Sequence, residues 1–365
     1  MTMSELLAGG AEKTALELVG ALAGRGYEFV VASMRRSDGV SGLGDAFAAA
    51  GATVYEGLAR RRLDPLATWR LARIIRRHEI DVMLVVDVPR NAMFHSFLAV
   101  PLSGRKIPRL CWCKSMPGGQ SGRFWRHLRA YKAFCKLAVI ICTSRLQRNR
   151  LIECGLSRRH MPLIRNGVNL QSLPHAGETD LPLPKGKRII VQVANVMPDK
   201  DHATLIAAAE KLAVARDDFH LVLAGRGTDS PSLADSVRRA GLTGRISLAG
   251  YRQDIPAILA AADLFVLSTR SEVFSVAILE AMAAGVCVVT SDIPAMDEVF
   301  THRIEGLKFP PGDGAALAGA IAELLDDTDL RLRLAAAGGR RAGRFGLLRM
   351  AAGFDRLLRV LGNKH

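Results

Sequence analysis

Short runs of β-branched and aromatic residues alternate along the chain with longer segments, rich in Ala and Leu, that repeat with helical spacing. This alternation is typical of repeated βαβ units, which build parallel sheets with helices on both faces. The runs that predict strands are 29–34, 53–55, 82–87, 110–113, 139–143 and 163–165 in the first half, and 188–194, 220–224, 246–248, 264–268, 286–290 and 306–309 in the second. We therefore predict two doubly wound α/β domains.

Residues 171–187 have the composition of a linker, with three prolines, two glycines and few large apolar side chains. We predict a first domain over 1–170, a second over 188–344, and a C-terminal helix over 345–365 that crosses back to the first domain. The first domain opens with Gly9 and Gly10 after only eight residues. Its first strand is therefore expected to be shortened or missing, which would leave an exposed sheet edge or indicate a misassigned start.

The composition is that of a globular protein: 365 residues, 49% hydrophobic and 23% charged. The net charge of +15 lies in one half, because residues 1–175 carry 27 Lys and Arg against 12 Asp and Glu, and residues 176–365 carry 23 of each. A basic half favours phosphates, an anionic membrane or nucleic acid as partners, or serves solubility alone. The six cysteines form no CxxC pair, and we interpret them as reduced, buried thiols of a cytoplasmic protein.

Two segments of the chain concern contact with a membrane. The uncharged run at 91–104 is too short for a spanning helix and is interrupted by His95 and Pro101. Residues 123–136 instead predict a basic amphipathic helix that can lie on anionic lipid, or a solvated face over a packed helix. Its cations and interleaved apolar residues are Arg123, Arg126, Arg129, Lys132, Lys136, Phe124, Trp125, Leu128, Tyr131 and Phe134, and Arg60 to Arg62, Arg70, Arg73, Arg76 and Arg77 add further charge.

Two carboxylates flank the start of a predicted helix in the second domain. Glu272 lies in the loop after the strand 264–268, and Glu280 lies on the helix that begins near Ser275. The unpaired N–H groups of residues 275–277 carry partial positive charge, which suits a diphosphate. Each carboxylate can accept hydrogen bonds from sugar or ribose hydroxyls. The alternative is that Glu280 solvates an amphipathic helix and Glu272 only favours the helix dipole.

This segment, EVFSVAILEAMAAGVCVV from Glu272 to Val289, resembles the donor-domain signature of the family 4 retaining glycosyltransferases of GT-B fold. The resemblance covers nearly the whole chain. Gly9-Gly10-Ala11-Glu12 is similar to the family's first glycine turn, residues 165–169 (RNGVN) to its junction strand, and residues 195–202 (NVMPDKDH) to its phosphate-binding loop.

The resemblance implies roles for single residues. Glu280 would bind ribose, Glu272 the donor sugar and Lys200 the diphosphate. Residues expected near the donor through backbone or side chain are Phe274, Ser275, Val276, Asn195, Arg226, Arg270 and Tyr251, the last beside the nucleobase, and Gly9 and Gly10 would form an acceptor or phosphate loop.

The chain also departs from the family pattern. Asn195 stands where an Arg is usual, so that Arg226 or Arg270 would have to compensate, and Val273 and Ser275 replace two glycines. Lys114 stands where many relatives carry a catalytic His; it could bind a phosphate, and His95 and His127 are the alternatives.

By this resemblance the chain is expected to be a hexosyltransferase-type enzyme that moves a sugar, with retention, from a nucleoside diphosphate sugar to a hydroxyl of a glycan or lipid-linked acceptor in polysaccharide or lipopolysaccharide synthesis. Glu272, Lys200 and Lys114 are the expected catalytic residues. No obligatory metal or other cofactor is expected, and the protein would lie in the cytoplasm or peripherally at the inner membrane face. The alternatives are a nucleotide-sugar-binding protein with degraded activity, a nucleotide-sugar epimerase and, on charge alone, a nucleic-acid-binding protein, for which no motif is found.

Overall fold

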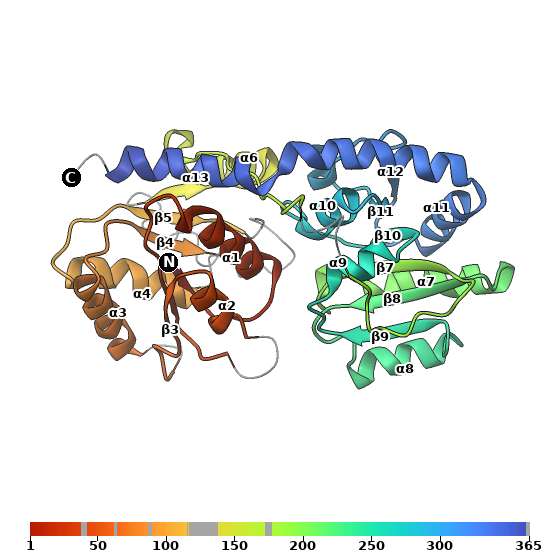
Figure 1. Ribbon diagram of the computed structural model, residues 1–365, viewed down its shortest axis with the longest axis horizontal. Helices are drawn as coiled ribbons and strands as arrows, with labels where there is room; N and C mark the ends of the chain where they lie inside the picture. The colour runs from red at the N-terminus through yellow and green to blue at the C-terminus, as the bar shows by residue number, and fades with distance from the viewer. Residues whose placement is uncertain are drawn as a thin grey trace. The chain divides into compact units, whose positions relative to one another are not determined.

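The computed structural model describes residues 1–37, 42–61, 64–86, 90–114, 116, 138–171 and 177–362. The chain divides into two compact units (Figure 1). Unit 1 consists of Met1–Gly167 and Leu347–His365, and unit 2 consists of Val168–Gly346. The prediction of two α/β domains is confirmed, because each unit contains a six-stranded parallel sheet.

The sheet of unit 1 has the strand order β3-β2-β1-β4-β5-β6. Its strands are β1 (Thr2–Met3), β2 (Val30–Ser33), β3 (Thr53–Tyr55), β4 (Met83–Val86), β5 (Arg109–Trp112) and β6 (Val139–Ile141). The first strand is short, as predicted, but the expected exposed edge is wrong. β1 lies between β2 and β4, and its residues Thr2 and Met3 pair with Ala32 and Ser33, so that the sheet edges are β3 and β6.

Helices cover both faces of this sheet, and β4 shows why. Met83 and Val85 enter one apolar core with α3 and α4, whereas Leu84 and Val86 enter another with α1 and α13. A strand buried on both faces reads as a continuous apolar run. The helices of unit 1 are α1 (Gly10–Ala23), α2 (Gly44–Ala49), α3 (Pro65–Arg77), α4 (Arg90–Leu102), α6 (Arg145–Glu153) and α13 (Leu347–Gly362), with a 3-10 turn at Arg158–His160.

The C-terminal helix α13 packs within unit 1. Its Phe354 lies edge-on to Trp112, with 4.6 Å between ring centroids, and both side chains are fully buried. Tyr27 donates a hydrogen bond of 2.7 Å to the Asp355 carboxylate. An aromatic contact and a polar clamp therefore hold this last helix on the same unit as the first strand, although some 350 residues separate them in sequence.

Unit 2 has the strand order β12-β11-β10-β7-β8-β9. Its strands are β7 (Arg188–Val193), β8 (Phe219–Ala224), β9 (Ile246–Gly250), β10 (Leu264–Leu267), β11 (Cys287–Ser291) and β12 (Leu307–Phe309). Its helices are α7 (His202–Ala215), α8 (Pro231–Arg239), α9 (Ile255–Ala260), α10 (Val276–Ala283), α11 (Gly314–Asp326) and α12 (Thr328–Ala342), with 3-10 turns at Pro198–Lys200, Pro294–Glu298 and Gly343–Phe345. Because all six strands are parallel, the loops that follow them meet at one edge of the sheet.

Some sequence predictions have a different outcome. Residues 163–165 form no strand; only Leu163 bridges to Cys142, because Pro162 and Ile164 make single backbone bonds to the end of β6. The basic helix predicted at 123–136 and His127 lie outside the described residues. Five cysteines, Cys111, Cys113, Cys142, Cys154 and Cys287, are buried and free, and Cys135 is not described. No helix within the described ranges is long and apolar enough to cross a membrane.

Candidate functional site

The strongest concentration of predicted site residues lies at the carboxyl edge of the unit 2 sheet. Lys200 ends the 3-10 turn that follows β7, and Glu272 lies in the loop that follows the adjacent strand β10. The Lys200 ammonium donates directly to the Glu272 carboxylate, and both side chains are mostly buried, with 22% and 13% exposed. Two charged residues 72 positions apart, each predicted as a donor ligand, are therefore brought into contact.

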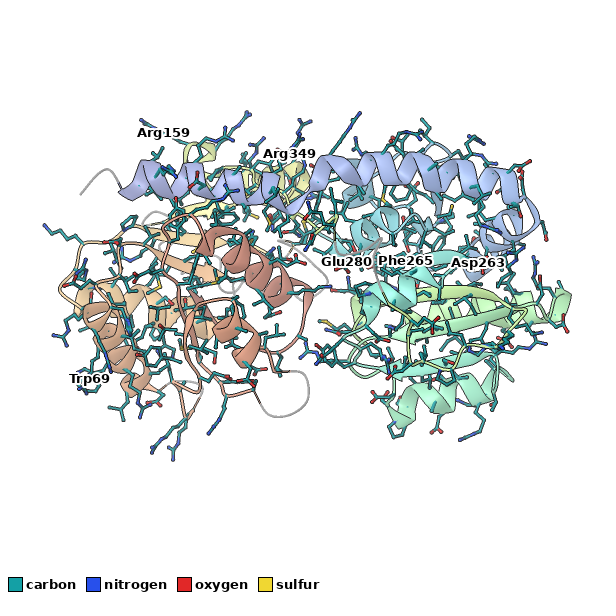
Figure 2. All side chains as sticks on the ribbon, viewed as in Figure 1. Trp69, Arg159, Asp263, Phe265, Glu280 and Arg349 are labelled. Carbon is teal, nitrogen blue, oxygen red and sulfur yellow. The ribbon has the colours of Figure 1, made fainter. Side chains whose placement is uncertain are left out.

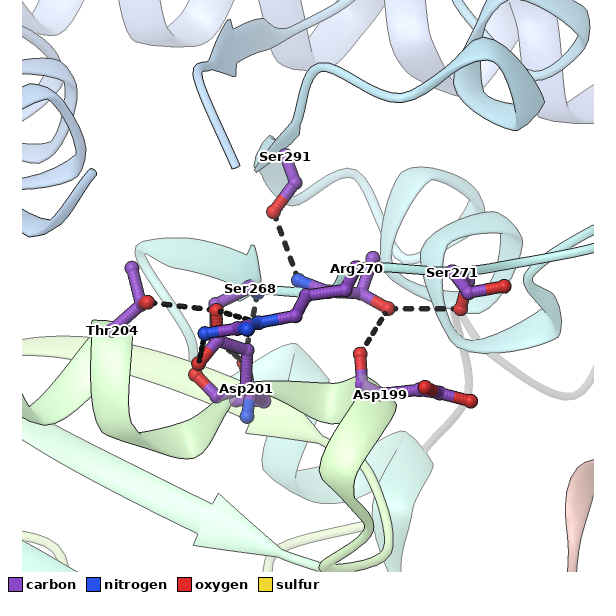
Figure 3. A network of polar contacts seen from close by, with 9 residues as sticks. Asp199, Asp201, Thr204, Ser268, Arg270, Ser271 and Ser291 are labelled. Carbon is purple, nitrogen blue, oxygen red and sulfur yellow. Dashed lines mark hydrogen bonds and ion pairs between the residues drawn. The ribbon is translucent and has the colours of Figure 1, made fainter. Parts of the chain in front are cut away.

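Backbone hydrogen bonds fix these two loops to each other (Figure 3). The Asp199 carbonyl accepts from the Arg270 N–H at 2.8 Å and from the Thr269 hydroxyl at 2.8 Å. The Ser268 hydroxyl donates to the Asp201 carbonyl at 3.1 Å. Because these bonds flank Lys200 on one loop and precede Glu272 on the other, they set the separation of the two side chains.

Asp201 is a site residue that the sequence analysis missed. It adopts left-handed backbone angles (φ 34°, ψ 49°) at the N-cap of α7 and is 7% exposed. Its carboxylate accepts from Arg270 Nε at 3.0 Å and from the Thr204 hydroxyl at 2.8 Å (Figure 3). Burial alone would raise its pKa, but these hydrogen bonds and the Arg270 charge lower the pKa overall. An Asp directly before a predicted helix start was the available signal.

Arg226 and Arg270 are the two candidates to replace the cation missing at Asn195, and their surroundings differ. The guanidinium of Arg270 is held by Asp201. Arg226 is half-buried in the loop after β8, and its guanidinium makes no ion pair within the described part of the chain. The Asn195 side-chain oxygen accepts from the Arg226 backbone N–H at 2.9 Å. Arg226 is thus the arginine whose charge is open to a ligand.

The approach of the β7 and β8 loops depends on Gly225. Its φ is +146°, and a Cβ at this position would lie 2.2 Å from the Ala194 carbonyl oxygen. No side chain fits such a gap, since the obstacle is backbone. Gly225 therefore allows Asn195 to reach the Arg226 backbone.

The helix after Glu272 presents its N-terminus to the same edge of the sheet. Ser275 is the N-cap of α10 and Val276 its first residue. The Phe274 ring is buried and packs edge-on against Phe345, with centroids 5.3 Å apart. Phe274, Ser275 and Val276 are all less than 10% exposed.

Glu280 and Tyr251 complete the predicted donor set. Glu280 lies in the second turn of α10 and is only 7% exposed (Figure 2). Tyr251 directly follows β9, the edge strand beside β8, and is half-buried. Together with the loops after β7, β8 and β10, they spread the candidate ligands across four neighbouring strands.

His202, the first residue of α7, was not assigned a role from the sequence. It is 6% exposed, and burial lowers its pKa, with a smaller opposing effect from the Asp201 charge. The imidazole is therefore neutral near pH 7, close in sequence to Lys200, whose positive charge is expected to bind the diphosphate.

The other predicted site residues belong to unit 1. Lys114 follows β5, donates to the Asn166 side-chain oxygen at 2.6 Å, and lies over the Trp112 ring at 3.7 Å. Gly9 is the N-cap of α1 and Gly10 its first residue. His95, the alternative to Lys114, is 1% exposed in the core and bonded to Thr68 at 2.7 Å.

Among the described residues, no group of three or more His, Cys, Asp or Glu side chains is arranged to hold a metal ion. The charged groups described at this edge of the sheet include Lys200, Arg226 and the N-terminus of α10 on the positive side, and Glu272 and Glu280 on the negative side.

Comparison with known proteins identifies the family of the chain. A family model described as Glycosyltransferase Family 4 matches residues 8–172, and one described as Glycosyl transferases group 1 matches residues 178–341. The lipopolysaccharide core biosynthesis glycosyltransferase LpsD of Rhizobium meliloti (strain 1021) is 28% identical over 90% of this chain and 89% of its own length. A phosphatidyl-myo-inositol mannosyltransferase of Mycolicibacterium smegmatis is 27% identical over 80% of this chain and 74% of its own.

The fold is also found among solved structures. Anabaena HepE, crystallised in complex with UDP-glucose, matches with a TM-score of 0.82 over 99% of this chain and 100% of that chain, at 21% sequence identity. At this identity the likeness shows the shared fold, a pair of doubly wound units.

Proposed function

Because the chain belongs to the family 4 glycosyltransferases of GT-B fold, we propose that it transfers a sugar, with retention, from a nucleoside diphosphate sugar to a hydroxyl of a glycan or lipid-linked acceptor. The observation that carries the proposal is the contact of Lys200 with Glu272 beside the N-terminus of α10. A cation and a carboxylate side by side, close in sequence to a helix N-terminus, suit a ligand in which a diphosphate adjoins a hydroxyl-rich sugar.

In the proposed reaction the bond between the sugar and the diphosphate breaks, and negative charge accumulates on the departing phosphate. Lys200, Arg226 and the N–H groups of residues 274–276 would stabilise that charge. Glu280 would accept hydrogen bonds from the ribose, and Glu272 from the donor sugar, so that the donor is held in one orientation. When a phosphate binds Lys200, the ammonium exchanges one anionic partner for another.

Glu272 is not proposed as a covalent nucleophile, because its role in this scheme is to accept hydrogen bonds from the hydroxyls of the donor sugar. The acceptor would instead attack from the face that the diphosphate leaves, with the departing phosphate accepting the proton of the acceptor hydroxyl. Lys114, already paired with Asn166, would bind a phosphate of the donor or acceptor. No step in this scheme needs a metal ion.

The relatives' names guide the choice of substrates. LpsD is a lipopolysaccharide core enzyme, the mycobacterial relative acts on a phosphoinositide, and HepE was crystallised with UDP-glucose. We therefore infer an acceptor of the cell envelope, reached at the inner face of the cytoplasmic membrane, and place UDP-sugars first among the donors to be tested.

The test is transfer by the purified chain from UDP-, GDP- and ADP-sugars to envelope glycans and glycolipids, with the anomeric configuration of the product read by NMR. Lys200→Ala should lower the rate at least about a hundredfold, whereas Lys211→Ala, an exposed lysine on α7, should not. Donor turnover that needs no acceptor would indicate an epimerase, and nucleotide binding without turnover a degraded enzyme. A product of inverted configuration would refute the retaining mechanism.

A further inference from the structure

The outward faces of α3 and α4 in unit 1 carry a concentration of exposed apolar side chains. On α3, Leu66 is 57% exposed and Trp69 is 52% exposed (Figure 2). On α4, Phe94, Leu98 and Leu102 are 38%, 39% and 61% exposed. Soluble surfaces normally scatter such residues singly, and a continuous group indicates a contact surface.

These residues form one surface, because the two helices pack against each other on the same side of the sheet. Their buried faces enter a single core cluster, with Leu71 and Ile75 from α3 and Phe97 and Val100 from α4. The exposed positions on α3 follow helical spacing at 66, 69, 73 and 76, and those on α4 at 94, 98 and 102. Two amphipathic helices in one layer therefore present parallel stripes outward.

The charge of this α3/α4 face has one sign. α3 contains four arginines (Arg70, Arg73, Arg76 and Arg77) and no Asp or Glu, and α4 contains no acidic residue. Arg73 lies over the Trp69 ring at 5.7 Å, which places a cation beside the exposed aromatic. The exposed acids closest in sequence, Glu79 and Asp81, follow α3, and Asp81 is 3.7 Å from Arg105.

We propose that the α3/α4 face is a peripheral membrane-binding surface that contacts anionic lipid headgroups through its arginines and inserts Trp69, Phe94, Leu98 and Leu102 at the headgroup boundary. This surface rests on the proposed function, which has the acceptor reached at the inner membrane face, and it shares no residue with the proposed donor site. A second copy of the chain fits less well, because a symmetric contact would bring the arginines of the two faces together. A polyanion such as nucleic acid would leave the apolar stripe of α4 in water, whereas a bilayer covers it.

Flotation with vesicles of phosphatidylcholine, with and without phosphatidylglycerol, tests the proposal on the full-length chain. The wild type should bind only the anionic vesicles and should dissociate at about 1 M salt, where the Debye length is only about 3 Å. Arg73→Gln with Arg76→Gln should weaken binding about fivefold per arginine removed. Trp69→Ser with Leu98→Ser should weaken it about tenfold or more.

Matched control variants distinguish an effect of the α3/α4 face from an effect of removing any exposed arginines or any exposed apolar side chains. Arg238→Gln with Arg239→Gln removes two exposed arginines from the last turn of α8, and Val214→Ser with Leu332→Ser removes two exposed apolar side chains from unit 2. Neither control should change vesicle binding. Circular dichroism, melting temperature and nucleotide binding should be the same in all variants, which shows that each has folded.

Insertion is read directly from tryptophan fluorescence with brominated lipids. Trp69 is exposed and Trp112 is fully buried, so quenching present in the wild type but lost in Trp69→Phe comes from Trp69. The proposal is overturned if the chain does not bind anionic vesicles, if the α3/α4 variants bind as tightly as the controls, or if light scattering shows a dimer that Trp69→Ser dissociates.

Discussion

Asp201 allows the strongest test of how the candidate site is held together. Asp201→Asn keeps the shape of the side chain, tolerates the left-handed backbone and can still accept from Thr204, but it removes the charge that faces Arg270. Asp201→Ala removes both hydrogen bonds and places an alanine at φ 34°. The pair of variants therefore separates the charge of Asp201 from its other contributions.

The expected magnitudes follow from the contacts. A hydrogen bond to a charged group contributes about 1.5–3 kcal/mol and a neutral one about 0.5–1.5 kcal/mol, a difference of about 1 kcal/mol. Because the Arg270 side chain is 51% exposed, solvent screening reduces this difference, and we expect Asp201→Asn to lower the free energy of unfolding of unit 2 by about 0.5–1 kcal/mol. Asp201→Ala also loses the Thr204 bond and adds left-handed strain of about 1–2 kcal/mol, for a total of about 3 kcal/mol.

The assay is urea unfolding of the whole chain, followed by two probes. All three tryptophans precede residue 168, so tryptophan fluorescence reports unit 1, and a transition seen by far-UV circular dichroism but not by fluorescence reports unit 2. The lowered pKa of Asp201 means that its contribution is present above about pH 4, the unfolded value, and is lost as the pH falls through the folded pKa. Asp201→Asn should therefore lose stability less steeply in acid.

The reasoning would be refuted if Asp201→Asn destabilised unit 2 as much as Asp201→Ala, because the charge would then account for the whole effect. It would also be refuted if neither variant changed the unit 2 transition. Arg270→Lys changes the other side of the Asp201–Arg270 contact: it keeps the positive charge but removes the planar guanidinium group.

Three further predictions concern single features. Arg226→Ala should weaken the binding of nucleoside diphosphates about tenfold. Arg270→Ala should weaken this binding less than Arg226→Ala does, but should lower the melting temperature more. If calorimetry shows that Arg270→Ala weakens binding more than Arg226→Ala, Arg270 is the phosphate ligand. Burial lowers the pKa of His95, His202 and His220, so that near pH 6.5 the unfolded chain binds more protons than the folded chain. The melting temperature should therefore decrease when the pH is lowered from about 7.5 to about 5.5, and a melting temperature that stays constant or increases would contradict this. Gly225→Ala should destabilise unit 2 by about 2–4 kcal/mol, because its Cβ would meet the Ala194 carbonyl. Gly241→Ala, also at positive φ but in open space, should cost about 1 kcal/mol. Equal effects of the two variants would contradict the close approach of Gly225 to the Ala194 backbone.

Much of the fold follows from the sequence because its strands are buried on both faces. β8 and β10 are buried throughout, so they read as continuous apolar runs that stand out from the helices between them. β1 is different: with two residues it has no periodicity, and its central place is set by pairing with β2 and β4. The expectation of an exposed edge failed for this reason.

The candidate site also has one part that the sequence predicts and one part that it does not. Lys200 and Glu272 lie in loops after strands, and parallel strands bring such loops to one edge, so their proximity follows from local motifs. The pairing of Asp201 with Arg270 joins residues 69 positions apart, and no local pattern distinguishes Arg270 from Arg226 as the open cation. His95 likewise pairs with Thr68 on another helix, a contact that no local pattern reveals.

The most direct test of the central claim, that unit 2 binds a nucleoside diphosphate sugar, is a thermal-shift titration of the purified chain with UDP, GDP, ADP, CMP and their sugar conjugates. Ligand binding to the folded state raises the melting temperature, and we predict a selective shift with one nucleoside diphosphate that is lost in Glu280→Ala but kept in Glu210→Ala, an exposed carboxylate on α7. No shift with any nucleotide in a folded sample, or an equal shift in Glu280→Ala, would contradict the account.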